Sequence, residues 1–312
     1  MSNILAVFGA TGQQGGSVIN YVLNDQELSQ KYKVRAITRD VNSAKAKELD
    51  ERVEVVQGDA FDLASLEVAL AGVHTVFAMT TPAFGPDAFD VEFNSAKRIA
   101  DVAVEKGVQY IIFSTLPSVT EISGGKYTKI VPFDAKAKAE QYIRSLPVKS
   151  AFYRPGSFME NFLSQPFWGP RQAPDGGTTW VVSTHMSPKT RLPLIDAVGD
   201  SGKFVGAVLA EPEKFQGKTL SAATRMYSLE ELAATMSKVT GQKVVYEQIT
   251  PEEFAKRVPV MTEIFVEAFQ YYEEFGYFGP DSENLVAWAA ENARGKLSTL
   301  EEFLKAHPPQ LS

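Results

Sequence analysis

The chain has 312 residues, of which 44% are hydrophobic and 22% charged, so it is long enough to bury its own core. It contains no cysteine, which excludes disulfides, thiolate nucleophiles and cysteine metal sites. A net charge of −7 without a run of lysine and arginine argues against direct nucleic-acid binding. No metal-ligand cluster is visible in the sequence. No apolar stretch would span a membrane, and the first predicted strand leaves no room for a signal peptide. We therefore expect a cytoplasmic protein with access to the nucleus through a partner.

The first half of the chain alternates apolar runs with helix-like segments. Strands are predicted at residues 3–9, 32–39, 53–58, 74–80, 108–115 and 148–156, and helices at 13–23, 42–49, 62–72, 87–106 and 133–145. This alternation predicts a parallel sheet with helices on both faces. Right-handed crossovers then give an α/β, doubly wound Rossmann domain over residues 1–155.

The second half is less regular and predicts a smaller α/β domain over residues 156–312 that binds a substrate or a partner. A strand at 178–184 and a helix at 201–210, capped by Asp200, are expected to return to the first domain, and another strand follows at 218–224. Three capping boxes predict helix starts: Ser228 with Glu231, Thr250 with Glu253, and Ser298 with Glu301.

An apolar stripe near residue 265 repeats at helical spacing and predicts core packing. It comprises Met261, Ile264, Phe265, Phe269 and Tyr272, with Tyr271, Tyr277 and Phe278 beside it. The alternative is that these aromatic side chains form a pocket wall or a groove for a partner.

The segment "FGATGQQGGSV" joins the first strand to the first helix. Gly9, Gly12 and Gly15 permit a tight turn and close approach of the backbone to a pyrophosphate, and the helix that starts near Gln13 directs free N–H groups at it. Thr11, Gln13 and Gln14 belong to the same turn. The alternative is a tight turn without a ligand.

The motifs "FGATGQQGGSV", "ITRD", "VVQGD", "PFDAKAKAEQYI" and "RPGSFMENFL" together resemble the NmrA-like family of atypical short-chain dehydrogenases. The resemblance covers nearly the whole chain and is strongest over residues 4–165. It implies a Rossmann fold and a dinucleotide cofactor. The family includes fungal nitrogen-metabolite regulators and a human redox sensor.

Arg39 follows the second strand, where NAD-selective sites usually carry an acid. Its guanidinium suits the 2′-phosphate of NADP, so NADP is expected to bind more tightly than NAD, although Asp40 would repel a phosphate and Arg39 is otherwise a solvated strand-end charge. The resemblance implies further cofactor contacts at Asp59, Ala60, Phe61, Thr80, Thr81, Pro82, Phe158 and Asn161. Asp59 has a second interpretation, as the cap of the helix that follows it.

The tyrosine of the Tyr-x-x-x-Lys pair of short-chain dehydrogenases is absent. Lys136 occupies the lysine position, but Pro132 stands four residues before it and has no proton to give. Lys136 is then expected to bind the cofactor ribose, unless it is a surface lysine, and Tyr127 is a weak substitute that only a loop would bring inward. No catalytic residue is assigned beyond these two weak candidates.

Three functions follow from these observations. The first is an NADP(H)-binding, redox-sensing regulator with little or no dehydrogenase activity, acting through a protein partner such as a transcription regulator. The second is an NADPH-dependent oxidoreductase that acts on quinones or reactive carbonyls. The third is a scaffold that has lost its cofactor, against which the intact glycine turn argues. The sequence does not specify the oligomeric state.

Overall fold

The computed structural model describes residues 2–165, 167–173, 177–309 and 311. It contains a seven-stranded, fully parallel sheet in the order β11-β6-β5-β4-β1-β2-β3. Its strands are β1 (Asn3–Phe8), β2 (Tyr32–Thr38), β3 (Glu54–Gln57), β4 (Thr75–Ala78), β5 (Tyr110–Ser114), β6 (Lys149–Pro155) and β11 (Thr219–Ala222). The doubly wound α/β prediction is confirmed, and the strand predicted at 218–224 extends the sheet beyond β6.

Helices cover both faces of this sheet because successive side chains of its strands point to opposite sides. Leu5 and Val7 of β1 pack on the face covered by α1 and α9, whereas Ala6 and Phe8 pack on the face covered by α4 and α5. The first face carries α1 (Gln13–Asn24), α2 (Leu28–Lys31), α3 (Ala44–Asp50), α9 (Ala197–Ala210), α10 (Pro212–Phe215) and α14 (Ser282–Glu291). The second carries α4 (Leu63–Ala69), α5 (Ala88–Glu105) and α7 (Val131–Ser145).

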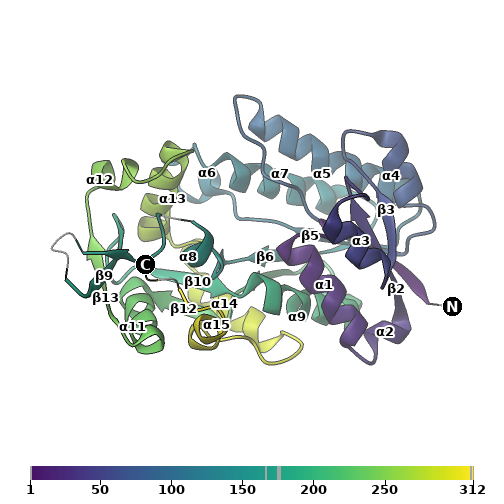
Figure 1. Ribbon diagram of the computed structural model, residues 1–312. Helices are drawn as coiled ribbons and strands as arrows, with labels where there is room; N and C mark the ends of the chain where they lie inside the picture. The colour runs from purple at the N-terminus through teal and green to yellow at the C-terminus, as the bar shows by residue number, and fades with distance from the viewer. Residues whose placement is uncertain (1, 166, 174–176, 310, 312) are drawn as a thin grey trace.

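Two three-stranded sheets form the other half of the molecule, on the left in Figure 1. In one, β10 (Arg191–Ile195) lies between β7 (Ser157–Phe158) and β12 (Arg225–Ser228); in the other, β9 (Thr179–Thr184) lies between β13 (Lys243–Gln248) and β8 (Arg171–Gln172). The remaining helices are α6 (Val119–Ile122), α8 (Asn161–Ser164), α11 (Leu229–Thr240), α12 (Pro251–Ala255), α13 (Thr262–Phe275) and α15 (Leu300–Ala306). A separate aromatic-rich core holds this half together.

The strand expected to return to the first domain does not do so. β9 pairs with β13 instead, and β11 takes the edge of the main sheet beside β6. Helix α9 does pack against α1, where Gly202 donates its N–H to the Ser17 hydroxyl at 2.9 Å and a Cβ at Gly202 would lie 2.5 Å from the Ser17 carbonyl oxygen.

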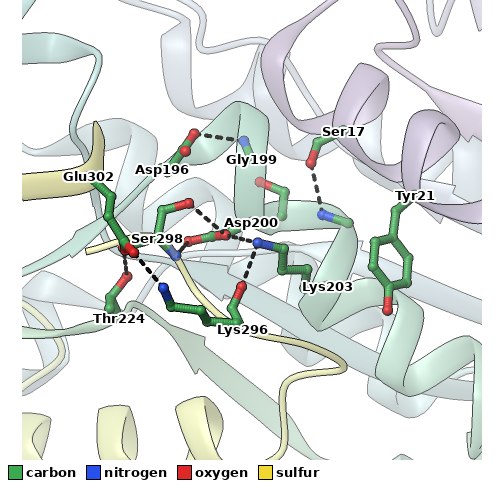
Figure 2. Close-up of polar contacts among 12 residues, drawn as sticks. Ser17, Tyr21, Asp196, Gly199, Asp200, Lys203, Thr224, Lys296, Ser298 and Glu302 are labelled. Carbon is green, nitrogen blue, oxygen red and sulfur yellow. Dashed lines mark hydrogen bonds and ion pairs between the residues drawn. The ribbon is translucent and has the colours of Figure 1, made fainter. Parts of the chain in front are cut away.

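Two predicted helix caps are wrong for one shared reason, shown in Figure 2. Asp196 caps α9 by accepting from Gly199 N–H, whereas Asp200 is fully buried and accepts from the Lys203 ammonium at 2.7 Å and from the Ser298 N–H at 2.9 Å. The Ser298 hydroxyl also donates to Asp200, so it is unavailable as a cap. The third capping box is therefore Thr299 with Glu302.

The capping boxes at Ser228 with Glu231 and at Thr250 with Glu253 are confirmed. Both depend on contacts within one helical turn, so tertiary packing does not displace them.

Candidate functional site

The turn between β1 and α1 uses its glycines in different ways. Gly9 has a φ of +64°, a left-handed conformation that favours glycine. A Cβ at Gly15 would lie 2.3 Å from the Gly9 carbonyl oxygen, so α1 packs on the turn only with glycine there. A Cβ at Gly12 would meet that oxygen alone, at 3.3 Å, and otherwise point into open space. Gly12 therefore leaves space for a ligand, whereas Gly15 serves the packing.

Helix α1 starts with backbone N–H groups that have no acceptor. Gly12 is its N-cap and carries no capping side chain, and the N–H groups of residues 13–15 donate to no acceptor in the part of the chain that the structure describes. Free N–H groups and the positive end of the helix dipole favour an anion at this position. The turn and the helix end together fit a pyrophosphate.

A groove of about 610 Å³ runs from this turn past the carboxyl ends of β2, β3 and β4, and we call it the outer groove. It contains all the residues predicted for the adenosine half of the cofactor. Its lining is Phe8, Gly9, Thr11, Gly12, Ile37, Thr38, Arg39, Asp40, Ser43, Gly58, Asp59, Ala60, Phe61, Met79, Thr80, Thr81, Pro82, Ala83, Val91, Ser95 and Ile99.

The far end of the outer groove combines a cation with an exposed ring. Arg39 is exposed and makes no hydrogen bond or ion pair with any residue that the structure describes. Phe61 is 63% exposed, and its N–H donates to the Asp59 carboxylate at 2.9 Å. Asp62, not Asp59, caps α4, so the capping interpretation of Asp59 is wrong. Asp59 instead fixes the loop that presents the Phe61 ring.

A second hollow of about 410 Å³ continues the outer groove across Met79, Thr80 and Pro82, and we call it the inner cavity. It brings together the predicted residues Gln13, Gln14, Lys136, Phe158 and Asn161 from three separate segments of the chain. The complete lining is Gln13, Gln14, Met79, Thr80, Pro82, Ser114, Thr115, Leu116, Phe133, Lys136, Pro155, Gly156, Ser157, Phe158, Asn161, Gln165, Trp168, Phe265, Tyr272 and Tyr277. Ten of these twenty residues have apolar or aromatic side chains, and most of the surface exposed to the cavity is apolar.

Lys136 is buried beside the inner cavity and is not a surface lysine. Its ammonium donates to the Thr80 hydroxyl at 2.7 Å, to the Thr80 carbonyl oxygen at 3.1 Å and to the Glu92 carboxylate. The Lys136 and Glu92 side chains are 9% and 1% exposed. Burial lowers the pKa of Lys136, and the Glu92 charge opposes this change without cancelling it. All three N–H groups of the Lys136 ammonium thus have acceptors in the protein. Lys136 can donate to a ribose hydroxyl only if one of these three hydrogen bonds breaks.

Tyr127 does not enter the cavity. Its hydroxyl donates to the Glu274 carboxylate at 2.7 Å, and its ring packs edge-on against Tyr271 and Phe275 of α13. Tyr127 is thus held against α13 and does not line the inner cavity, so it is excluded as a substitute for the missing catalytic tyrosine.

Two amide side chains form a polar edge of the inner cavity. Gln165 donates its Nε2–H to the Asn161 Oδ1 at 3.2 Å, and the Gln165 Oε1 is buried without a partner among the described residues. Elsewhere in the cavity lining, the Ser114 hydroxyl donates to Gln14 Oε1 at 2.7 Å. The Asn161 Nδ2 group, the second Gln165 N–H and the Gln165 Oε1 have no partner among the described residues, so the pair keeps donors and an acceptor for a ligand.

Sequence reasoning missed Glu92 and favoured core packing for Tyr272 and Tyr277, which also line the cavity. Glu92 carries a local signal, because it lies on the same face of α5 as the buried Ala88, Ala96 and Ile99. A carboxylate within such an apolar stripe requires a buried partner. The two tyrosines carry no local signal that separates a core position from a cavity wall.

The model of the NmrA-like family matches residues 1–304. The chain belongs to the NmrA-like family. It is 30% identical over 312 residues to an NmrA-like family domain-containing protein of Dictyostelium discoideum, with 98% of each chain covered. It is 32% identical over 270 residues to the NmrA-like family domain-containing oxidoreductase FrzB of Cladobotryum sp., covering 80% of this chain and 77% of FrzB.

Solved structures share the fold of this NmrA-like chain. The negative transcriptional regulator NmrA, solved with NADP and with NAD, is 24% identical, with TM-scores of 0.80 and 0.79 over 97% of this chain and 94% of NmrA. The NADPH-dependent quinone oxidoreductase QOR2 of Escherichia coli, solved with NADPH, is 20% identical, with a TM-score of 0.75 over 97% of this chain and 99% of QOR2. The NmrA-like fold thus occurs both in a transcriptional regulator and in a quinone oxidoreductase.

Among the described residues, no helix combines the length and apolar character that a membrane crossing requires. Within the same residues, no group of three or more histidine, aspartate or glutamate side chains is arranged to hold a metal ion.

Proposed function

We propose that this NmrA-like protein binds NADP(H) and reduces a flat conjugated acceptor, a quinone or a reactive carbonyl compound. The observation that carries the proposal is the inner cavity, which is mostly apolar, has a volume of about 410 Å³ and opens into the outer groove across Met79, Thr80 and Pro82. An apolar hollow with a few polar groups suits a small aromatic ligand. Its position beside Phe158 and Asn161 suits a ligand that meets the nicotinamide.

The outer groove supports NADP over NAD. Thr38 ends β2 without an acid for the 2′-hydroxyl, and Arg39 next to it has no protein partner among the described residues. Asp40 accepts the Asn42 N–H at 2.8 Å, so its carboxylate is committed to the loop. A guanidinium that pairs with a phosphate contributes roughly 1.5–3 kcal/mol.

When bound, the reduced dinucleotide supplies the hydride. The residues of the chain position the two reactants: the glycine turn and the α1 N-terminus hold the pyrophosphate, Phe61 and Arg39 hold the adenosine half, and the apolar walls of the inner cavity exclude water. Pro132 supplies no proton at the usual catalytic position. A quinone suits such a site because its reduction needs less help from an acid than that of a simple ketone.

The redox-sensing regulator is the second candidate, and the Lys136 contacts favour it. Because Thr80 and Glu92 occupy every N–H donor of Lys136, a dinucleotide that engages this lysine has to rearrange the buried cluster. A ligand with different affinities for the two arrangements shifts their populations. The oxidised and reduced cofactors would then favour different surfaces for a protein partner such as a transcription regulator.

Steady-state NADPH oxidation distinguishes these candidates. We expect turnover with quinones and reactive aldehydes and very slow turnover with simple alcohols and ketones. Tight NADPH binding without turnover of any acceptor contradicts the reductase and favours the regulator. Failure to bind either dinucleotide in a calorimetric titration contradicts both.

A further inference from the structure

Two tyrosines that line the inner cavity have phenol hydroxyls without a hydrogen-bond partner among the described residues. Tyr272, on α13, and Tyr277, just beyond it, both line the cavity and are 9% and 6% exposed. Neither hydroxyl forms a hydrogen bond with any residue that the structure describes. Most other buried tyrosines have one: the Tyr153 hydroxyl bonds to Ser201 at 2.8 Å and that of Tyr110 donates to the Pro212 carbonyl oxygen at 2.8 Å, whereas the buried Tyr271 hydroxyl has no partner among the described residues. Buried hydroxyls normally find a partner, and of these three tyrosines without one only Tyr272 and Tyr277 line the inner cavity, so these two indicate a ligand.

The rings of the two tyrosines are held in place by the packing around them. Gly276, with a φ of +81°, follows the last residue of α13 and turns the chain. As a result, the centroids of the Tyr272 and Tyr277 rings lie 4.7 Å apart. Phe133 of α7 contacts both rings, at 6.2 Å and 5.6 Å between centroids. Phe133 lies one turn before Lys136 and both line the cavity, so the two tyrosine rings pack against the helix that carries Lys136.

Several other polar hydrogens of the cavity are already used. Lys136 donates to Thr80 and Glu92, Ser114 donates to Gln14, and Pro132 has none to give. Burial raises the phenol pKa of Tyr272 and of Tyr277, so both keep their protons across the neutral range. The two phenols are therefore uncommitted O–H donors on residues that line the cavity expected to hold a substrate.

We propose that Tyr272 and Tyr277 donate hydrogen bonds to the oxygen atom of the substrate that is reduced, and that one of them delivers its proton. This inference rests on the proposed reductase function. In the step, the acceptor takes a hydride, with its electron pair, from the reduced dinucleotide. The phenol O–H bond breaks and its proton goes to the reduced oxygen; the phenolate then regains a proton from water. This pair would donate the proton that the tyrosine of the Tyr-x-x-x-Lys pair donates in short-chain dehydrogenases. Both tyrosines of the pair come from the C-terminal half of the chain.

Phenylalanine variants test the pair because they remove only the hydroxyls. The variants are Tyr272→Phe, Tyr277→Phe and the double variant, with Tyr271→Phe as the matched control. Tyr271 is the neighbour on α13, and its hydroxyl is buried, lacks a partner among the described residues and does not line the cavity. Calorimetry with menadione on NADP⁺-saturated protein measures binding without turnover. We expect roughly tenfold weaker menadione binding in the double variant, with NADP⁺ affinity unchanged.

Kinetics with NADPH and menadione supply the second readout. We expect kcat to fall by about a hundredfold in the double variant, and Tyr271→Phe to behave like the wild type. Equal menadione binding in the wild type and the double variant overturns the proposal, as does an equal loss in Tyr271→Phe or an absence of menadione binding to the wild type. If binding weakens only in the double variant but no form oxidises NADPH, the phenol site is supported and the reductase function fails.

Discussion

Replacing Lys136 with methionine removes the cation from a buried ion pair and leaves the Glu92 charge behind. Glu92 is 1% exposed, and its Oε2 already lacks a partner among the described residues, so the protein offers little to compensate the carboxylate. Breaking a buried pair in this way costs about 3–5 kcal/mol of unfolding free energy. With an unfolding entropy of about 2.1 cal/mol/K per residue, that loss lowers the Tm of a chain of 312 residues by about 5–8 °C.

Urea denaturation and thermal unfolding measure this loss directly. Lys138→Met is the matched control, because Lys138 lies on the same helix but is exposed, and it should change stability by less than about 0.5 kcal/mol. Lys136→Met combined with Glu92→Leu should recover most of the loss, since no charge remains buried. Equal stabilities of Lys136→Met and Lys138→Met would refute the buried pair.

Three further predictions concern the cofactor and the fold. Arg39→Ala should weaken NADPH binding about tenfold to a hundredfold and leave NADH binding almost unchanged, as measured by calorimetry; equal losses for both would contradict the role of Arg39. Gly12→Val should abolish dinucleotide binding in a folded protein, whereas Gly15→Ala should lower Tm, because a Cβ at Gly15, unlike one at Gly12, overlaps backbone atoms. Circular dichroism measures the fold and the Tm of each variant, and calorimetry measures dinucleotide binding. Burial raises the pKa of Asp200 in the folded protein above its value in the unfolded chain. The folded state therefore binds a proton at Asp200 more tightly than the unfolded state does. This proton contributes to the unfolding free energy at about pH 4 and below, and the contribution is lost as pH rises through the folded pKa. The unfolding free energy of the wild type minus that of Asp200→Asn should therefore decrease between about pH 4 and pH 7, and an increase would contradict the raised pKa.

The sequence was sufficient for those parts of the fold that depend on local patterns. The alternation of apolar runs predicts six parallel strands, and the capping boxes at Ser228 and Thr250 depend on one helical turn each. Strand pairing is not local, so nothing near residues 178–184 indicates that β9 pairs with β13. Ser298 fails as a cap because Asp200, 98 residues earlier, takes its hydroxyl.

The same distinction applies to the candidate site. The glycine turn, Arg39 and Phe61 follow directly from strand ends, and the structure brings them into one groove. Which tyrosine lines the cavity depends on packing between residues far apart in the sequence. The Tyr127 hydroxyl donates to Glu274, whereas the turn at Gly276 brings Tyr277 to the cavity. No spacing in the sequence separates these two outcomes.

Filling the inner cavity tests the central claim, that the acceptor is reduced there. Leu116 lines the cavity and is only partly buried, so Leu116→Trp adds bulk to the cavity without touching the glycine turn or the outer groove. The decisive measurement is kcat/KM for menadione with saturating NADPH in the wild type and in Leu116→Trp. We predict turnover by the wild type and at least a tenfold lower kcat/KM in the variant, with NADPH affinity unchanged. Equal kcat/KM values, or no turnover by the wild type, would contradict the account.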